Sequence, residues 1–580
     1  MVNCKINGIA IQVEEGTTIL DAAKKVNVKI PTLCYNPDLP AWAACGLCIV
    51  RIEGSPKMVR ACTTPVNEGL SIITHDPEIV QVRRTVLELI LSNHPNDCLQ
   101  CPRSGSCELQ TLAAEFGIRE VPYENFLRGT PVDDSNPAIT LNPDKCVRCG
   151  RCVKVCQDMQ NVWAIEFLGR GEKGRIASAA DVPLGDSPCI KCGQCAAHCP
   201  VGAIYERDDT VKVWNRLSDP DIHSVVQIAP AVRVALGEEF GLEPGTVITK
   251  KIYAALRRLG FETVFDTNFA ADLTIMEEGS ELVTRLTKGG DIPLITSCCP
   301  AWVDYMEKYY DDMIPNFSTA KSPQQMMGAM IKAYWAPKAG IDPKKVYSVS
   351  VMPCTAKKYE THRNDDMKSS GEWDVDCSIT TRELARMIKQ AGIDILNLPD
   401  EEADSPLGPY TGAGTIFGAT GGVMEAAVRT AHVLVTGKEM GSVDFMPARG
   451  LEGVKEAEVD MGGTKVKIAI AHQMGNIAAV LDKVREARDA GKPSPWQFIE
   501  VMACRGGCIA GGGQPYGCTD EVRAKRIEGI YHDDEKSTYR CSHQNPYITQ
   551  VYEEFLEKPN SHKAHELLHT HYEPRPLYMK

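Results

Sequence analysis

The stretch TSCCP at residues 296–300 decides the fold of the longer part of this chain. Two later motifs, VMPC at residues 351–354 and EVMACRGGC at residues 500–508, carry further cysteines. Thiolates spread over so much chain are typical ligands of one soft-metal centre built between loops. Buried structural cysteine is the alternative, and it explains one such motif more easily than three. The predicted centre draws on the following cysteines: Cys298, Cys299, Cys354, Cys504 and Cys508.

Length and composition set the broad class. A chain of 580 residues is longer than a single hydrophobic core can support, so it should fold as several domains. Most of its 24 cysteines lie in closely spaced runs rather than as secreted disulfide pairs, which favours metal binding in a reducing compartment. We expect a cytoplasmic protein, because no export signal and no run of eighteen apolar residues is found. The net charge of −13 disfavours nucleic acid and anionic membranes as partners.

The three cysteine motifs, read with their flanking residues, resemble a known family. TSCCPAW, VMPCTAKK and EVMACRGGCIAGGG are similar to the three signature motifs of the iron-only, or [FeFe], hydrogenases. The resemblance covers essentially the whole chain, and motif matches gain force when several agree in order and context. It implies the reaction 2H⁺ + 2e⁻ ⇌ H₂.

The first domain is predicted over residues 1–78 as a β-grasp fold. Asn7-Gly8 between two alternating runs predicts a tight hairpin, and Thr18 with Asp21 predicts the start of a helix. Four cysteines then follow on predicted loops: Cys34, Cys45, Cys48 and Cys62. They suit a [2Fe-2S] cluster, as in the ferredoxin-like domain of the resembled family and of respiratory complex I. Tetrahedral zinc is the alternative.

The second domain is predicted over residues 79–125, with a helix over residues 77–92. The set Hx3Cx2Cx5C follows that helix: His94, Cys98, Cys101 and Cys107. A lone histidine is more often a surface or capping residue. Three cysteines at this spacing, and the matching motif in the same two families, favour a His-ligated [4Fe-4S] cluster.

The third domain is predicted over residues 138–209, after a loop-like junction. The pattern Cx2Cx2Cx3C occurs twice and is typical of two-cluster ferredoxins, in which each fourth cysteine ligates the other cluster. One [4Fe-4S] cluster is assigned to Cys146, Cys149, Cys152 and Cys199. The other is assigned to Cys189, Cys192, Cys195 and Cys156. Only the second run is followed by a proline, Pro200.

The fourth domain is predicted over residues 219–580 as a large, two-lobed α/β domain. Apolar runs predict strands over residues 225–230, 271–276, 291–296 and 345–352, and helical patterns cover residues 249–260 and 380–390. The glycine-rich stretch at residues 411–425 lacks the strand, the spacing and the acidic partner of a dinucleotide site. We expect it either to approach a cofactor closely or to form a flexible loop.

The resemblance implies roles for residues of the large site. Cys299, Cys354, Cys504 and Cys508 would hold a [4Fe-4S] subcluster, and Cys508 would bridge to a diiron subsite with CO, CN⁻ and an azadithiolate. Lys357 would face a cyanide. The rest of the pocket would be lined by Ala229, Pro230, Ser322, Gln324, Met352, Phe417 and Met502. The family often has serine where this chain has Ala231, which puts a second cyanide contact in doubt.

The resemblance also implies a proton route. Cys298 would relay protons beside the diiron subsite, and the onward positions are Glu278, Ser318, Glu281 and Arg285. Glu281 and Arg285 are spaced i, i+4, so an ordinary helix-face ion pair is the alternative for them. The cysteines without an assignment are expected to be structural: Cys4, Cys377, Cys518 and Cys541. Four C-terminal histidines are expected at the surface: His562, His565, His569 and His571.

Electron partners follow from the same resemblance. Chains of this kind work with ferredoxin, or as the catalytic subunit of NAD(P)-linked, electron-bifurcating hydrogenases with a flavoprotein and a thioredoxin-like iron-sulfur subunit. No flavin or nucleotide site is evident in the sequence, so NAD(P) chemistry would belong to another subunit. Hydrogenase maturation enzymes would build the cofactor in an anaerobic cell. A non-enzymatic hydrogenase-like assembly protein and an H₂ sensor are the alternatives.

Overall fold

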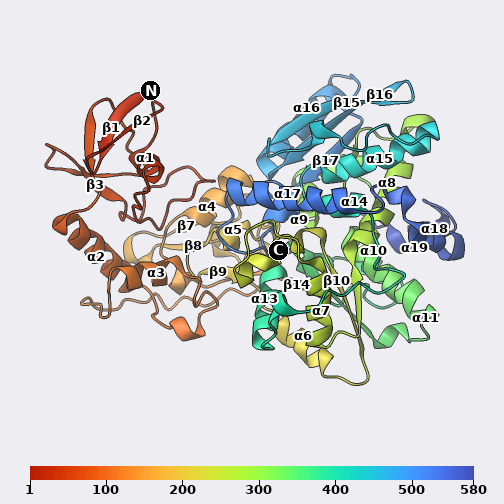
Figure 1. Cartoon of the computed structure of the whole chain (residues 1–580), viewed down its shortest axis with the longest axis horizontal. Helices are drawn as coiled ribbons and strands as arrows, with labels where there is room; N and C mark the ends of the chain where they lie inside the picture. Colours follow the sequence, from red (N-terminus) through yellow and green to blue (C-terminus); the bar gives the residue numbers. More distant parts are fainter. Residues whose placement is uncertain (580) are drawn as a thin grey trace. The chain divides into compact units, whose positions relative to one another are not determined.

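The computed structural model describes residues 1–579, which form two compact units (Figure 1). The first unit comprises residues 1–159, 163–187 and 198–205. The second comprises residues 160–162 and 188–197 together with the chain from residue 206 onward.

The first unit begins with a five-stranded mixed sheet in the order β2-β1-β5-β3-β4. Its strands are β1 (Val2–Ile6), β2 (Ile9–Val13), β3 (Ile49–Ile52), β4 (Met58–Arg60) and β5 (Leu70–Ile73). The predicted hairpin is confirmed: β1 and β2 are antiparallel, and Asn7 and Gly8 both have positive φ. Thr18 caps α1 (Ile19–Lys25) by accepting from the Asp21 N–H, as predicted, and the apolar face of α1 packs on the sheet.

The rest of the first unit is built from short elements around cysteine loops. The predicted helix is α2 (Pro77–Leu91), whose first turn is capped by Asp76. The other elements include α3 (Glu108–Glu115), β6 (Ile139–Leu141) paired with β9 (Ile204–Glu206), α4 (Arg151–Lys154), and the hairpin of β7 (Glu166–Leu168) and β8 (Arg175–Ala177).

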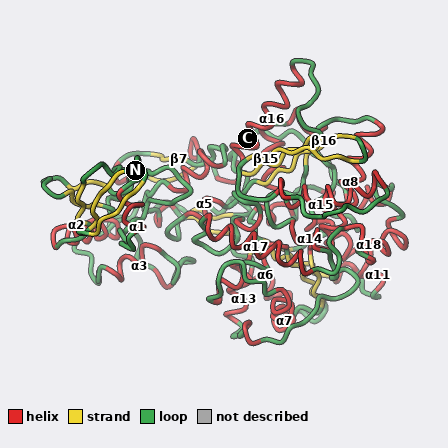
Figure 2. Tube along the Cα trace, turned by 45° about the horizontal axis from the view of Figure 1, so that its top comes forward, coloured by secondary structure: helices red, strands yellow, loops and turns green. Residues whose placement is uncertain are grey.

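The second unit contains two separate four-stranded sheets, drawn in yellow in Figure 2. The first has the order β11-β10-β13-β14 and is parallel throughout: β10 (His223–Ile228), β11 (Thr263–Asp266), β13 (Val346–Met352) and β14 (Cys377–Thr380). The second has the order β12-β17-β16-β15, with one antiparallel pair, β15 with β16: β12 (Leu294–Ile295), β15 (Val454–Met461), β16 (Thr464–His472) and β17 (Phe498–Met502). The two sheets agree with the expected α/β lobes.

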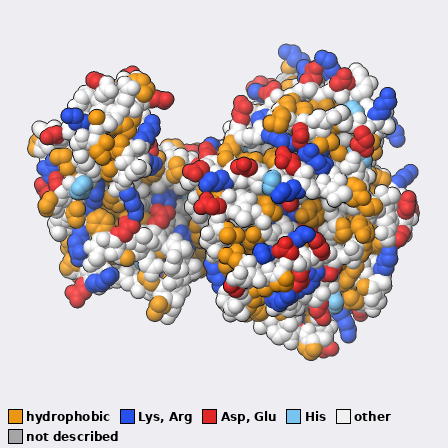
Figure 3. Space-filling view, in the orientation of Figure 1, with side chains coloured by type: hydrophobic (Ala, Val, Ile, Leu, Met, Phe, Trp, Pro, Cys, Tyr) orange, Lys and Arg blue, Asp and Glu red, His pale blue; other side chains and the backbone are white. Residues whose placement is uncertain are grey.

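Helices cover these sheets. The longer ones are α7 (Thr249–Leu259), α8 (Thr267–Lys288), α9 (Pro300–Tyr309), α10 (Pro323–Met330), α13 (Thr381–Gln390), α15 (Gly422–Thr436), α16 (Met474–Asp489) and α17 (Asp520–Lys536). Helices α15 and α16 both contact the second sheet. Acidic and basic side chains are interspersed on the visible face of this unit (Figure 3).

Two sequence-based expectations need correction. Residues 271–276, predicted as a strand, lie inside α8. Periodicity cannot distinguish a short apolar run in a buried helix from a buried strand, and this part of α8 is buried nearly all round. The glycine-rich stretch is not a flexible loop: it forms α14 (Gly412–Ile416) and the start of α15, and both are buried.

None of the helices within residues 1–579 is both long and apolar enough to span a membrane.

Candidate active site

The cysteine motifs lie at the carboxyl ends of parallel strands. TSCC follows β12, MACRGGC begins at the end of β17, and VMPC ends β13. Strands β12 and β17 are adjacent, so that the Thr296 N–H donates to the Ile499 carbonyl at 3.1 Å. In the other sheet, the Ala229 N–H at the end of β10 donates to the Val351 carbonyl at 3.0 Å. Loops at this edge of parallel sheets are the usual place for ligand sites.

Four cysteines from these loops form one group: Cys299, Cys354, Cys504 and Cys508. Burial raises the pKa of every one of them, and for Cys354, whose pKa rises to about 12, the negative charge of Cys299 adds to the effect. The field of Cys354 and Cys299 likewise raises the pKa of Cys504 and of Cys508, so the four sulfurs lie close enough to repel as thiolates. Backbone N–H groups of Ala301, Trp302 and Ala503 are directed at the Cys299 sulfur. Metal-bound thiolates that accept backbone hydrogen bonds fit this arrangement, as in a [4Fe-4S] cluster.

Gln194 contacts the same group, and the sequence analysis did not single it out. Its Nε2 donates to the Cys504 sulfur at 3.1 Å and to the Ala510 carbonyl at 3.0 Å. Its position inside the run CGQC, between two predicted cluster ligands, was the available signal.

Lys357 is buried beside the cysteines, as expected, but it is not alone. Its Nζ lies 2.8 Å from the Glu360 carboxylate and donates to the Cys298 carbonyl at 3.2 Å. Glu360 also accepts from Ser322 Oγ at 2.8 Å and Gln324 Nε2 at 3.0 Å. Burial opposes the charge of Lys357, but the Glu360 carboxylate outweighs it and raises the pKa of the lysine. Glu360 therefore contacts three predicted pocket residues: Lys357, Ser322 and Gln324. The sequence analysis did not single out Glu360, although its spacing of i, i+3 from Lys357 was an available signal.

The predicted apolar residues are all buried, but they divide between two clusters. Phe417 and Met502 belong to the same buried cluster as Cys298. Met352 and Ala229 belong to the core around the first sheet. Pro230 is buried next to Ala231, whose carbonyl accepts from Gln514 Nε2 at 2.9 Å.

The glycine-rich stretch approaches the third cysteine motif closely. Gly507 has φ +95, and a Cβ there would lie 2.6 Å from the backbone nitrogen of Thr420. Only glycine fits such a position without strain. The Thr420 N–H donates to the Gly506 carbonyl at 3.0 Å, and the Ile509 N–H donates to the Gly418 carbonyl at 2.9 Å. These contacts hold the loop that carries Cys504 and Cys508.

The predicted proton-route residues lie on α8 and on the segment before α10. Glu281 accepts from Ser318 Oγ at 3.1 Å and pairs with Arg285 at 2.7 Å, so the i, i+4 ion pair exists and also contacts Ser318. Glu278 is buried, and the hydroxyls of Ser318 and Ser297 lie near its carboxyl group. Burial raises the pKa of Glu278 to about 8, the charge of Glu281 adds to the rise, and the nearby hydroxyls of Ser318 and Ser297 oppose it.

Cys298 shares this environment. Burial raises the pKa of its thiol well above the ordinary value, and the charge of Glu278 adds to the rise. Cys298 and Glu278 are therefore close enough to interact, and both favour their protonated forms.

The C-terminal segment contributes residues that the sequence analysis missed. Tyr572 Oη donates to the Ser318 carbonyl at 2.9 Å. His569, expected at the surface, is buried: its Nε2 lies 3.1 Å from Glu277 and its Nδ1 2.8 Å from Thr319 Oγ1. A buried carboxylate partner accounts for this correction, because it satisfies the imidazole away from water. His562, His565 and His571 are exposed, as expected.

Comparison with known proteins identifies the family. A family model described as iron only hydrogenase large subunit, C-terminal domain, matches residues 222–512, and one described as iron hydrogenase small subunit matches residues 520–575. The chain is 48% identical to the NADP-reducing hydrogenase subunit HndD of Solidesulfovibrio fructosivorans, over 99% of this chain and 99% of that protein. This chain belongs to the iron-only hydrogenase family.

Further relatives support the family. The hydrogenase is 40% identical to iron hydrogenase 1 of Clostridium pasteurianum, over 98% of this chain and 99% of that protein. A solved variant of the [FeFe]-hydrogenase HydA1 from Chlamydomonas reinhardtii is 41% identical, with a TM-score of 0.56, and covers 64% of this chain and 100% of that one. The cytosolic iron-sulfur assembly component 3 of Mus musculus is 31% identical, over 60% of this chain and 74% of that protein.

Three more family models match upstream of the hydrogenase domain. They describe a 2Fe-2S iron-sulfur cluster binding domain at residues 1–77, an NADH-ubiquinone oxidoreductase-G iron-sulfur binding region at residues 83–122, and a 4Fe-4S dicluster domain at residues 145–203. The hydrogenase therefore carries iron-sulfur domains of both the 2Fe-2S and the 4Fe-4S type.

The first two of these domains have residues that fit metal. The sulfurs of Cys48 and Cys62 lie 3.4 Å apart, and a hydrogen bond between Cys34 and Cys45 raises the pKa of the first thiol and lowers that of the second to about 6. His94 is buried, and neither of its ring nitrogens has a hydrogen-bond partner within residues 1–579. Burial lowers the pKa of His94, which keeps the imidazole neutral, the form that binds metal.

The dicluster domain brings together the four cysteines of one of the two predicted crossed assignments, which stays a prediction. One cavity in the first unit is lined by Cys146, Cys149, Cys152 and Cys199 together. Burial raises the pKa of Cys149, and the negative charge of Cys199 adds to the rise. The Cys146 sulfur accepts from the Arg148 N–H at 3.3 Å. Cys189, Cys192 and Cys195 lie in the second unit, whereas Cys156 lies in the first, so that the second predicted ligand set stays a prediction.

Proposed function

We propose that this hydrogenase interconverts protons, electrons and H₂ at an H-cluster held by Cys299, Cys354, Cys504 and Cys508. The observation that carries the proposal is the group of four cysteines, two of them buried and two partly buried, that follow the carboxyl ends of strands from two sheets and raise one another's pKa. When bound, such a cluster supplies a Lewis-acidic iron and an adjacent base for heterolytic chemistry. Cys508 would hold the diiron subsite as well as the [4Fe-4S] part of the cluster.

The surrounding side chains have separate proposed roles. Lys357, held by Glu360, places an ammonium donor in a buried pocket, where a charged donor makes a stronger hydrogen bond to an anionic ligand than a neutral donor does. Ser322 and Gln324 fix Glu360 in turn. Phe417 and Met502 exclude water. The side of the proposed pocket that faces the first sheet is lined by Ala229, Pro230 and Met352.

The proposed proton route runs through side chains that stay protonated because they are buried. Cys298 exchanges a proton with the reacting centre, and Glu278 exchanges it with Cys298. Ser318, Glu281 and Arg285 form the onward connection, of which the Ser318–Glu281–Arg285 part is hydrogen-bonded. A positioned acid–base group of this kind contributes about 10²–10⁴-fold to a rate.

Electrons would travel through one [2Fe-2S] and three accessory [4Fe-4S] clusters with the ligand sets given above. The proposed domain boundaries remain residues 1–78, 79–125, 138–209 and 219–580. The similarity to an NADP-reducing hydrogenase subunit favours a partner subunit that reduces NADP. We propose that this partner is a flavoprotein, that ferredoxin is the other acceptor, and that the protein is cytoplasmic. Retention of Cys298 and Lys357 beside the four ligand cysteines favours catalysis over an assembly role.

The test is an infrared spectrum of the anaerobic chain, produced together with hydrogenase maturation enzymes. Metal-bound CO and CN⁻ stretches that shift under H₂ are the expected result. Absence of these bands, with maturation verified on a known hydrogenase, would overturn the proposal. Purification from the native source then separates the partners, since a co-eluting flavoprotein indicates the NADP-linked complex and a lone chain indicates ferredoxin.

A further inference from the structure

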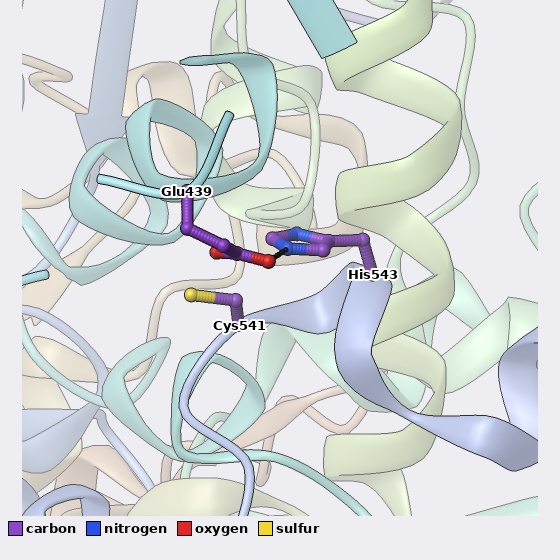
Figure 4. Close-up of side chains that lie close together, drawn as sticks. All are labelled: Glu439, Cys541 and His543. Atoms are coloured by element: carbon purple, nitrogen blue, oxygen red, sulfur yellow. Dashed lines mark hydrogen bonds and ion pairs between the residues drawn. The ribbon is translucent and has the colours of Figure 1, made fainter. Parts of the chain in front are cut away.

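Three side chains that the hydrogenase site does not use meet in the second unit (Figure 4). Glu439 lies on the loop that follows α15, whereas Cys541 and His543 lie at the start of the short turn η16 (Ser542–Gln544). One oxygen, one sulfur and one nitrogen from these residues all lie within 4.8 Å of one another. Figure 4 shows the thiol beside the Glu439 carboxylate and the imidazole at the edge of that carboxylate.

Neighbouring groups hold these side chains in place. His543 Nε2 lies 3.0 Å from Glu439 Oε1, and its Nδ1 lies 3.3 Å from Thr430 Oγ1 on α15. A histidine that donates its other ring N–H to a fixed acceptor is the usual form of a metal ligand, because the bond sets the tautomer and the ring orientation. The Cys541 sulfur accepts a hydrogen bond from the Gln544 backbone N–H.

A cation can reach the three side chains, because the group is open to solvent on one side and the positive charges near it are paired. The residue Cys541 is buried, at 1% exposure, whereas the side chain of Glu439 is 57% exposed, so solvent reaches the group from the carboxylate side. Two guanidinium groups, of Arg429 and Arg540, lie near the thiol. Both pair with Asp534, at 2.9 Å and 2.5 Å. Arg429 also pairs with Glu425 at 2.7 Å and Arg540 with Asp444 at 2.8 Å, so that the two positive charges are compensated.

The ligand types select the metal. A thiolate with an imidazole and a carboxylate suits Zn²⁺, whereas Ca²⁺ and Mg²⁺ prefer sets made of oxygen. We propose that Glu439, Cys541 and His543 bind one Zn²⁺, with solvent at the fourth position, and so fasten the loop after α15 to η16. On binding, the Cys541 thiol releases its proton to solvent and the zinc–sulfur bond replaces the sulfur–hydrogen bond.

Hydrogen bonds join the segment around η16 to α8, the helix that carries Glu278 and Glu281. Ser542 Oγ donates to Asp272 Oδ1 at 2.9 Å, and Asn545 Nδ2 donates to Asp272 Oδ2 at 3.1 Å. Asp272 lies on α8. Zinc that binds only the folded chain would therefore stabilise the contact of this segment with α8.

The test uses the cluster-loaded protein, dialysed against a chelator under anaerobic conditions and returned to one equivalent of zinc chloride. Zinc is measured by mass spectrometry and by X-ray absorption at the zinc edge, where the iron clusters do not contribute. We expect about one zinc per chain, with one sulfur at about 2.3 Å and nitrogen or oxygen at about 2.0 Å in the other positions.

Variants separate this site from the cluster cysteines. Cys541→Ser and His543→Gln should each weaken zinc binding by more than about tenfold, because loss of even an outer-shell partner has effects of that size. Cys518→Ser, which changes another cysteine outside the proposed ligand sets, should bind zinc as the parent does. If Cys541→Ser fails to fold, Glu439→Ala and His543→Gln carry the comparison, since Glu439 is exposed and His543 half-buried. A parent protein that holds no more zinc than His543→Gln, or zinc with four sulfur ligands, would overturn the proposal.

Discussion

The amide of Gln194 donates a hydrogen bond of 3.1 Å to the sulfur of Cys504. Gln194 lies between Cys192 and Cys195, which are predicted ligands of an accessory cluster, whereas Cys504 is a predicted ligand of the H-cluster. A segment that carries two predicted accessory-cluster ligands therefore also contacts a predicted ligand of the H-cluster. Hydrogen bonds to cluster sulfurs raise the reduction potential, because they stabilise the more negative reduced state.

Gln194→Met should lower the potential of the [4Fe-4S] part of the H-cluster. A net hydrogen bond of about 0.5–1.5 kcal/mol corresponds to about 20–65 mV for one electron. The measurement is a redox titration followed by electron paramagnetic resonance. Gln325→Met is the matched control, because Gln325 is also buried and its amide has no hydrogen-bond partner within residues 1–579. Equal potentials in the two variants would remove Gln194 from this role.

Cys298→Ser should leave the iron content unchanged and reduce H₂ turnover by about 10²–10⁴-fold, because a proton relay is lost while ligation is not. Iron analysis and H₂ evolution with a chemical reductant are the measurements. Cys377→Ser, at another buried cysteine outside the ligand sets, should keep its activity. Full activity in Cys298→Ser would exclude this thiol from the mechanism.

Glu278 should stay protonated at neutral pH and lose its proton near pH 8. A carboxyl whose pKa is raised in the folded state stabilises the fold fully below its unfolded pKa, near 4.5, and this contribution is lost as the pH rises to about 8. The infrared carbonyl stretch of a protonated carboxyl group should therefore be present at about pH 6 and disappear above about pH 9. Glu278→Gln should lack this titrating band and lower proton-coupled turnover. A band that titrates near pH 4.5 would contradict the assignment.

Glu360→Gln should disturb the H-cluster through Lys357. The ammonium would lose its buried counter-charge, a change that costs about 3–5 kcal/mol when one partner of a buried pair is removed. We expect shifted CN⁻ stretches in the infrared and reduced H₂ turnover. Glu383→Gln is the matched control, since it removes a buried carboxylate from the neighbouring Lys358, which keeps Asp209. Identical spectra for Glu360→Gln and the parent would show that Lys357 needs no counter-ion.

The features that the sequence predicted correctly are those that depend on neighbouring residues alone. Asn7-Gly8 and the Thr18 cap depend only on neighbouring residues, and both were predicted correctly. Asp272 and its neighbours were placed in a strand instead of α8, because their burial comes from segments distant in sequence, such as Thr411 and Ser542.

The same limit applies to the site. The cysteine motifs are visible because metal chemistry fixes both residue type and spacing. Glu360, Gln194 and His569 act through tertiary contacts, and an ordinary glutamate, glutamine or histidine carries no signal of its partner.

His94 offers a test of the accessory chain that does not involve the H-cluster. A neutral imidazole in place of a thiolate makes a cluster less negative and raises its potential, so His94→Cys should lower the potential of the proposed second-domain cluster, on the order of a hundred millivolts. A redox titration resolves this cluster from the others by its changed midpoint. His75→Cys controls for an added cysteine, because His75 is exposed in the same unit. If His94→Ala instead keeps the parent's iron content and all parent potentials, His94 is not a ligand, and its two unpartnered ring nitrogens need another explanation.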